Sequence, residues 1–397
     1  MKTNTGSVLA INGGSSSIKF AIYKIDEALA PLFVGQITGI GTLNTEFSFT
    51  DSCTGKTTRF NLKAASHYAA ATSLLDWLAK QAGCDVIRII GHRIVHGMKH
   101  QVPEIITPEL LTELRELSAF DPEHLPEEIN LVEMFKNRYP SCIQVACFDT
   151  SFHASMPIIA KLLPIPRRYQ ELGIQRYGFH GLSYSYLLEE LKQMAGNTVA
   201  NGRVILAHLG SGASLAAIHN GHCMDTSMGF TPSSGLPMST RTGDLDPGVA
   251  YYIIKTENLS SAEFSHLINK ESGLLGVSET SSDMQELLTR QHADCRAAEA
   301  VELFCYQTKK WIGSFASVLG GLDTLVFSGG IGEHSAEVRA RICQGLQFLG
   351  IALNESRNIN HSTIISEDKS KVCVRVVPTN EELMIARLVN PFLKNNS

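Results

Sequence analysis

Apolar positions along the chain fall into short runs that predict strands and into helical repeats that predict amphipathic helices. Residues 8–23 combine an apolar strand, a turn of glycines and serines, and a second strand in which Ile18, Phe20 and Ile22 alternate with other residues. Glycines let a backbone approach a ligand closely, and Lys19 adds a positive charge just beyond the turn, so the turn fits an anion such as phosphate. An ordinary glycine-rich hairpin is the alternative for this segment taken alone.

A second copy of this pattern favours the ligand-binding interpretation. Residues 204–218 repeat the apolar run, the polar residue, the Gly-Ser-Gly turn and the second apolar run, with His208 near the place that Asn12 holds in the first copy. Residues 324–333 add a third apolar run that enters a glycine-rich turn. Two similar units about 200 residues apart predict a duplicated fold whose halves face each other across a ligand.

Helix signals lie between these strands. Thr107 and Pro108 predict a capped helix start ahead of four leucines on one face, and residues 65–82 also carry leucines at helical spacing. Residues 338–349 predict one helix that stops at Gly350. Ser282 and Thr379 each begin a capping-box pattern.

Composition narrows the class of protein. The chain has 397 residues, enough for two domains, and a net charge of -5 gives no basic footprint, which argues against a nucleic-acid partner. No run of eighteen apolar residues and no signal peptide are present, so we expect a cytoplasmic protein without a membrane partner. Nine cysteines without a CxxC pair favour reduced thiols.

Charged residues next to predicted strands are the first candidates for chemistry. Arg93 lies in Gly-His-Arg-Ile-Val-His-Gly at the end of an apolar run, and Asp149 directly follows the apolar run 143–148. Such residues are well placed to meet a ligand. The alternatives are a solvated arginine and a turn-forming aspartate.

Three further residues stand in unusual surroundings. His180 lies among aromatic residues and glycines in Arg-Tyr-Gly-Phe-His-Gly-Leu-Ser, and Arg241 belongs to the long irregular segment 225–248. Glu381 precedes a helix, where acids usually complement the helix dipole, although it is also a suitable Mg²⁺ ligand. A structural role is the alternative for the histidine.

Eleven motifs, taken together, resemble the acetate kinase (acetokinase) family, within the superfamily of acetate and sugar kinases, Hsp70 and actin. They run nearly from end to end: INGGSSSIKF, GHRIVHG, FDTSFHASMP, RYGFHG, HLGSGAS, DTSMGFTP, TRTGDLDPG, NKESGLLG, SSDM, GGIGE and PTNEELMIAR. The resemblance implies an α/β fold of two actin-like (ribonuclease H-like) domains, each a mixed sheet flanked by helices, with nucleotide in the interdomain cleft. The domains expected are residues 1–150, to which residues 382–397 return, and residues 151–381. A cytoplasmic homodimer is expected.

The same resemblance assigns roles to individual residues. Asn12 and Glu381 would support Mg²⁺, with Mn²⁺ as an alternative metal. Nucleotide contacts would come from Lys19, His208, Leu209, Gly210, Ser211, Gly212, Asp283, Met284, Gln285, Gly330, Ile331, Gly332, Glu333 and His334. Arg93 and Arg241 would hold the carboxylate and the phosphoryl group, and His180 would stabilise that group. Val95, Phe179 and Pro232 would surround the methyl group of the substrate.

The implied reaction is reversible, in-line phosphoryl transfer from ATP to acetate, giving ADP and acetyl phosphate, a step of acetyl-CoA biosynthesis. Such a transfer needs alignment and positive charge more than covalent help. Because a carboxylate is ionised at pH 7, we expect Asp149 to position groups rather than to accept a proton. The alternatives are a propionate or other short-chain acyl kinase, and an actin-like or chaperone-like ATPase that changes conformation without phosphorylating a metabolite.

Several positions depart from the family pattern. The loop AFDPEHLP replaces a form like APLHNP and puts Glu123 where an apolar pocket residue is expected. The family's GTSH, NG and LEGLMMGTRSG are here GLSY, SG and SSGLPMSTRTG. Val95 favours a pocket sized for acetate, although one methylene discriminates by only ~1 to 3 kcal/mol.

Overall fold

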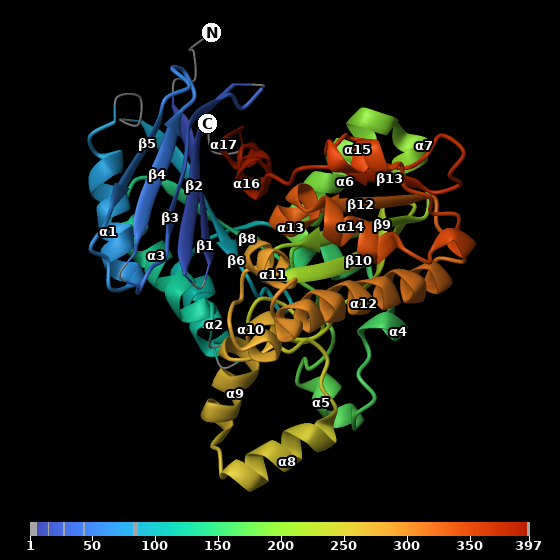
Figure 1. Cartoon of the computed structure of the whole chain (residues 1–397). Helices are drawn as coiled ribbons and strands as arrows, with labels where there is room; N and C mark the ends of the chain where they lie inside the picture. The colour runs from blue at the N-terminus through green and yellow to red at the C-terminus, as the bar shows by residue number, and fades with distance from the viewer. Residues whose placement is uncertain are drawn as a thin grey trace. The chain divides into compact units, whose positions relative to one another are not determined.

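The computed structural model describes residues 6–14, 16–26, 28–42, 44–81, 86–118, 120–121 and 123–394 (Figure 1). The chain divides into two compact units. Unit 1 comprises Met1–Ser151 and Asn380–Ser397, and unit 2 comprises Phe152–Thr379. Each unit is built on one mixed β-sheet.

The sheet of unit 1 has eight strands in the order β5-β4-β3-β2-β1-β6-β8-β7. Strands β1 to β5 form an antiparallel meander, whereas β6 runs parallel to both β1 and β8. The strands are β1 (Ser7–Gly14), β2 (Ser17–Lys24), β3 (Pro31–Thr38), β4 (Glu46–Asp51), β5 (Thr57–Asn61), β6 (Ile87–Ile94), β7 (Glu104–Ile105) and β8 (Ile143–Phe148). The helices are α1 (His67–Leu78), α2 (Pro108–Leu117), α3 (Leu125–Arg138), α16 (Glu381–Val389) and α17 (Pro391–Lys394).

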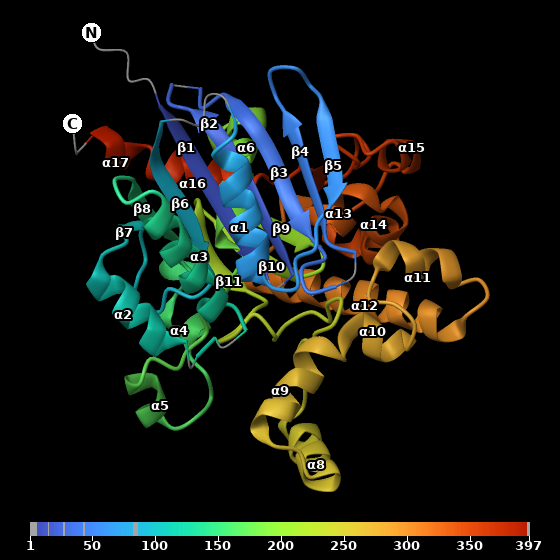
Figure 2. The same ribbon diagram turned by 90° about the vertical axis from the view of Figure 1, so that its left-hand side faces the viewer.

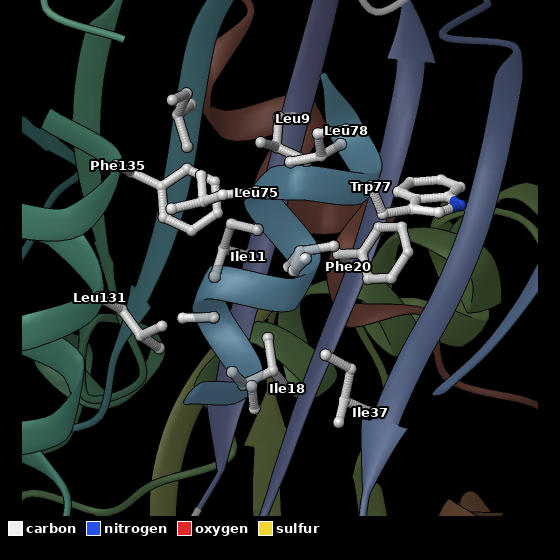
Figure 3. Packing of buried hydrophobic residues seen from close by; sticks show 14 of the residues in the cluster. Leu9, Ile11, Ile18, Phe20, Ile37, Leu75, Trp77, Leu78, Leu131 and Phe135 are labelled. Atoms are coloured by element: carbon white, nitrogen blue, oxygen red, sulfur yellow. The ribbon is translucent and has the colours of Figure 1, made fainter. Parts of the chain in front are cut away.

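Alternation along β1 determines which helix each side chain meets. Leu9 and Ile11 point into the main core of unit 1, where they pack with Phe20, Trp77 and Phe135 between the sheet and helices α1 and α3 (Figure 3). Figure 2 shows α1 lying over this face of strands β1 to β3. The intervening residues of β1 therefore face the opposite side, where α16 packs.

Helix α16 approaches the sheet closely because β6 offers a glycine at the contact. A Cβ on Gly91 would lie 2.4 Å from Cγ2 of Ile385 and 2.9 Å from Cγ1 of Val389. This close packing brings the N-terminus of α16 beside the end of β1, next to Asn12.

Unit 2 repeats the sheet topology of unit 1 in shorter form. Its strand order is β11-β10-β9-β12-β13, with β9 to β11 antiparallel and β12 parallel to both β9 and β13. The strands are β9 (Val204–Leu209), β10 (Ala213–His219), β11 (His222–Thr226), β12 (Thr324–Ser328) and β13 (Cys373–Val376). Strands β9, β10, β11, β12 and β13 thus correspond to β1, β2, β3, β6 and β8.

Helices cover the sheet of unit 2. Helix α6 packs through Tyr184, Leu187 and Leu191 against β9 and β10, and the long helix α12 contacts β9, β10 and β11. The helices of unit 2 are α4 (Ile158–Lys161), α5 (Arg167–Glu171), α6 (Gly181–Ala195), α7 (Asn197–Ala200), α8 (Pro247–Glu257), α9 (Ser261–Lys270), α10 (Gly273–Ser278), α11 (Met284–Arg290), α12 (Cys295–Val318), α13 (Gly329–His334), α14 (Ala336–Cys343) and α15 (Glu355–Ile359), with 3₁₀ turns at Ser151–Ser155 and Gln347–Leu349.

The two predicted hairpins are confirmed, since β1 pairs with β2 and β9 pairs with β10, both antiparallel. The capped start of α2 is also confirmed, because the Thr107 side chain accepts a hydrogen bond from the Leu110 amide. Within the described residues, no helix is both long and apolar enough to cross a membrane.

Three local predictions were wrong. The helix expected over residues 338–349 ends at Cys343, because Gln344 has a non-helical ψ of 125° and Gly345 takes a φ of +83°. The caps of α11 and α16 are Asp283 and Asn380, one residue later than the capping boxes predicted. The third glycine-rich segment forms helix α13 rather than a simple turn.

Candidate active site

Arg93 and Asp149 form a buried ion pair at the ends of two parallel strands of unit 1. The Asp149 amide donates to the Ile94 carbonyl at 2.9 Å, which continues the β6–β8 pairing. Arg93 then donates from Nε and Nη2 to Oδ2 of the fully buried Asp149, at 3.0 and 2.6 Å. Burial opposes the charge of Arg93, but the hydrogen bond to Asp149 and the combined negative charge of Asp149, Glu381 and Glu128 outweigh burial and raise the pKa of Arg93. Arg93 therefore stays ionised.

The same arginine connects strand β1 to this pair. Its Nη1 donates to the Gly13 carbonyl at 3.1 Å, and its side chain keeps 14% of its surface exposed. Since Arg93 is held on two sides yet reaches solvent, it presents a fixed cation to a small ligand.

Glu128 of α3 is a buried acid that the sequence did not single out. Its Oε2 accepts a hydrogen bond from the Val95 amide at 3.0 Å. Burial raises its pKa to about 8, although the positive charge of Arg93 acts in the opposite direction. Glu128 therefore carries a proton at neutral pH. Its position on the apolar face of α3, beside Leu125, Ile129 and Val132, was the available signal.

Asn12 joins two carboxylates at the N-terminus of α16. Its Nδ2 donates to Glu381 at 2.8 Å and to Glu382 at 2.9 Å. Burial and the neighbouring Glu381 charge raise the pKa of Glu382, while Lys19 lowers it. Lys19 is also the cross-strand partner of Asn12. Sequence reasoning proposed Asn12, Lys19 and Glu381 but missed Glu382.

These oxygens suit a magnesium ion. Mg²⁺ prefers one or two carboxylates and retained water molecules over a cage made entirely of protein ligands. Two adjacent carboxylates, one with a raised pKa, repel each other, and a divalent cation would relieve that repulsion. In the described residues, no group of three or more His, Cys, Asp or Glu side chains converges as a metal site, so substrate oxygens and water would complete the coordination.

In unit 2, His180 is held at the start of α6 in an unusual backbone conformation. Its φ of 59° and ψ of 24° are left-handed, and its Nδ1 forms a 2.9 Å hydrogen bond with the Ser214 hydroxyl. The imidazole stacks on His208, with ring centroids 4.3 Å apart. The hydrogen bond and the stacking together hold the imidazole in one orientation.

His208 belongs to a hydrogen-bond network that reaches the third glycine-rich segment. Its Nδ1 bonds the Ser183 hydroxyl, which in turn bonds the Thr379 hydroxyl, each at 2.8 Å. The Thr379 amide donates to Oε1 of Glu333, as does the Gly329 amide. The predicted nucleotide residues His208 and Glu333 are therefore parts of one polar network.

Gly212 lies directly between two predicted catalytic side chains. A Cβ at this position would be 3.2 Å from His180 Nε2 and 3.8 Å from Arg241 Nη1. Arg241 is oriented by the Pro232 carbonyl, which accepts from Nη1 at 3.1 Å. An imidazole and a guanidinium thus converge on the turn between β9 and β10, where a Cβ would crowd the imidazole.

Phe179 is fully buried, and its carbonyl accepts a hydrogen bond from His153 Nε2 at 2.9 Å. Burial lowers the pKa of His153 to about 4, so this histidine is neutral and serves as a structural support.

The remaining predicted nucleotide residues lie in two helices. Asp283, Met284 and Gln285 start α11, where Asp283 caps the helix by accepting from the Glu286 amide. Gly330, Ile331, Gly332, Glu333 and His334 lie in α13. The fully buried Arg339 braces α13 by donating to the carbonyls of Gly332 and Glu333 at 2.8 and 2.9 Å.

The structure therefore gathers the predicted residues into two sets. Unit 1 holds Asn12, Lys19, Arg93, Val95, Asp149 and Glu381, and unit 2 holds Phe179, His180, the turn His208–Gly212, Pro232, Arg241 and both helices that carry predicted nucleotide residues. Comparison with known proteins identifies the family of the chain. The model of the acetokinase family matches residues 7–387. The chain belongs to the acetokinase family.

Relatives of this acetokinase chain include acetate kinases and propionate kinases. It is 42% identical over 389 residues to an acetate kinase of Rhodopseudomonas palustris, covering 96% of this chain and 97% of the relative. It is 41% identical over 391 residues to a propionate kinase of Citrobacter rodentium, covering 96% and 95%. The crystal structure of Porphyromonas gingivalis acetate kinase superposes with a TM-score of 0.85 at 36% identity, covering 98% of this chain and all of that one. The predicted fold class is confirmed.

The buried acid of this acetokinase gives a pH-dependent stability prediction. The folded state keeps the proton of Glu128 up to a pKa of about 8, whereas an unfolded chain releases it near the ordinary glutamate pKa of 4.5. Stability therefore falls as pH rises between these values, because the unfolded state loses the proton first. Glu128→Gln, neutral in both states, should gain on the order of 1 to 3 kcal/mol relative to wild type between pH 5 and pH 8.

Urea unfolding at both pH values, followed by Trp77 fluorescence in a Trp311→Phe background, measures this difference in unit 1. Glu127→Gln, an exposed neighbour on α3, is the matched control. An equal effect of Glu128→Gln at the two pH values would contradict the assignment of a protonated Glu128.

Proposed function

We propose that this acetokinase transfers the γ-phosphoryl group of ATP reversibly to acetate, giving acetyl phosphate and ADP. One carboxylate oxygen of the acid forms the new bond to phosphorus as the bond to the ADP oxygen breaks, in line and without a covalent enzyme intermediate. Propionate is the second candidate substrate, because relatives of similar identity include propionate kinases as well as acetate kinases.

The convergence of His180 and Arg241 beside Gly212 carries this proposal. Phosphoryl transfer develops negative charge on the equatorial oxygens, and fixed donors and cations stabilise that charge. Both side chains reach the same glycine of the β9–β10 turn, whose backbone is suited to phosphate. A conformational ATPase would not need these two groups at one phosphate-binding turn.

Unit 1 supplies groups suited to the acid and to the metal. Arg93 would hold the substrate carboxylate, while Asp149 keeps its guanidinium in place. Because Asp149 is fully buried and already accepts two hydrogen bonds from Arg93, and because the substrate acid is ionised, we assign Asp149 a positioning role. Bound Mg²⁺, held by Glu381 and Glu382 beside Asn12, would neutralise phosphate charge and orient the phosphates.

A cytoplasmic homodimer is part of the proposal. Helix α8 has no buried residue, and it exposes Val249, Tyr251 and Tyr252 by 42%, 66% and 66%. A helix with this many exposed apolar side chains is typical of a surface that a second copy covers.

The reaction itself is tested by trapping the product. Purified protein with ATP, Mg²⁺, hydroxylamine and acetate should yield acetohydroxamate. The kcat/KM for acetate should exceed that for propionate by about 10-fold, which is the discrimination that one extra methylene group typically gives. ADP release that is independent of any acid, without hydroxamate, would replace the proposal with a conformational ATPase.

Arg241 should be essential for turnover but not for folding. Arg241→Ala removes a cation from the developing charge, so kcat should fall by about 10²- to 10³-fold, as for loss of one preorganised donor. The melting temperature should stay close to that of wild type. Arg296→Ala, which breaks an exposed ion pair with Glu279, is the control and should keep full turnover. Near-normal turnover of Arg241→Ala would refute its role.

The two acids at the start of α16, Glu381 and Glu382, should determine how much Mg²⁺ the activity requires. Removing Mg²⁺ with a chelator should abolish activity, and Glu381→Gln should raise the Mg²⁺ concentration for half-maximal activity by about 10- to 100-fold, as for the loss of a metal-orienting group. The control is Glu133→Gln, an exposed acid paired with Arg115 on the surface. An unchanged Mg²⁺ titration of Glu381→Gln would rule out this site.

A further inference from the structure

Glu128 carries one carboxyl oxygen whose hydrogen-bonding capacity is not used. The residue is only 4% exposed, and its Oε2 is engaged by the Val95 amide. Its Oε1 is buried and has no hydrogen-bond partner in the part of the chain that the structure describes. Burying such an oxygen without a partner costs about 1 to 3 kcal/mol, so it points to a group that binds there.

Glu128 lines a small cavity within unit 1. The cavity lies between the end of β1, the start of α1 and the start of α3, and it is lined by Gly13, Gly14, His67, Glu123, His124, Glu127, Glu128 and Leu131. The cavity is just large enough to admit the centre of one water-sized group. This space suits one water-sized group.

The cavity shares its walls with the residues proposed to hold the acid. Gly13, which lines the cavity, accepts a hydrogen bond from Arg93 through its carbonyl. Glu128 holds the backbone of Val95, two residues further along the chain than Arg93. A carboxylate held by Arg93 therefore has this cavity as a neighbour.

We propose that the cavity recognises the hydroxyl group of a short 2-hydroxycarboxylic acid, and that Glu128 is the residue that selects for it. This proposal rests on the proposed function. The substrate carboxylate stays on Arg93, and the hydroxyl group occupies the water-sized space against Oε1 of Glu128. Acetate remains a substrate, with a water molecule in the cavity beside it.

A hydroxyl group suits this position better than a methyl group of nearly the same size. A methyl group would leave Oε1 buried and unpaired, whereas a hydroxyl both donates and accepts. With its pKa raised to about 8, Glu128 is protonated at neutral pH, so its carboxyl group can also either donate or accept a hydrogen bond. Glu123, on the same cavity, makes the wall more polar still.

Hydroxyacetate and propionate are the matched pair of substrates for the test, because they differ only by a hydroxyl in place of a methyl group. The wild-type protein should turn over hydroxyacetate with a kcat/KM at least about 10-fold above that for propionate, measured by hydroxamate formation with acetate as reference. Glu128→Leu should lower this ratio by at least about 10-fold, whereas Glu128→Gln, which keeps hydrogen-bonding groups, should stay within about 5-fold of wild type. Glu133→Gln, on the solvent side of the same helix, should leave the ratio unchanged.

A wild-type kcat/KM ratio of hydroxyacetate to propionate below one would overturn the proposal. An equal loss of kcat/KM for all three acids in Glu128→Leu would also overturn it, because Glu128 would then have only a structural role. If Glu128→Leu does not fold, a crystal structure of the wild-type protein with hydroxyacetate decides. A substrate hydroxyl within about 3.2 Å of Oε1 supports the proposal, and a water molecule there with the hydroxyl elsewhere overturns it. If no acid at all yields hydroxamate, the proposed function fails, and the selectivity proposal fails with it.

Discussion

The ion pair between Arg93 and Asp149 is the interaction on which the charged cluster of unit 1 depends. A carboxylate with no exposure is tolerable only with a cation and hydrogen bonds beside it, and Arg93 provides both. The pair exists because β6 and β8 run parallel and in a register that ends both strands at the same edge. Once fixed there, Arg93 also links β1 through Gly13 and attracts Glu128 and Glu381. A single guanidinium therefore organises groups from three strands and two helices.

The repeated sheet topology explains why one chain can carry two kinds of site. In each unit, a hairpin places a polar residue near the end of its first strand, Asn12 in unit 1 and His208 in unit 2. The surrounding helices then determine the chemistry. Asn12 meets the acids of α16, which suit a metal, whereas His208 stacks on His180 beside a turn that suits phosphate. The repeated sheet topology places the polar residues, and the neighbouring helices provide the charged or polar groups around them.

Much of this arrangement could be predicted from the sequence, because periodicity and strand ends are local signals. Both hairpins, the start of α2 and the strand before Asp149 follow from patterns of a few residues. Glu382 could not be predicted, because acids near helix starts are usually exposed and only tertiary packing buries this one. For Glu128, the apolar face of α3 was the one signal against the same expectation of exposure. The caps of α11 and α16 were displaced by one residue because two adjacent residues in each case can cap a helix. Gly345 ended α14 despite a continuing apolar repeat, since its left-handed conformation overrides periodicity.

The left-handed backbone of His180 has a consequence for how its chemistry can be studied. A φ of 59° is costly for most side chains but tolerated by asparagine and glycine. Replacement by alanine would remove the imidazole and also strain the first turn of α6, so the two losses would be confounded. Asparagine preserves the backbone preference and a polar atom near Ser214, which makes it the cleaner probe of what the ring contributes.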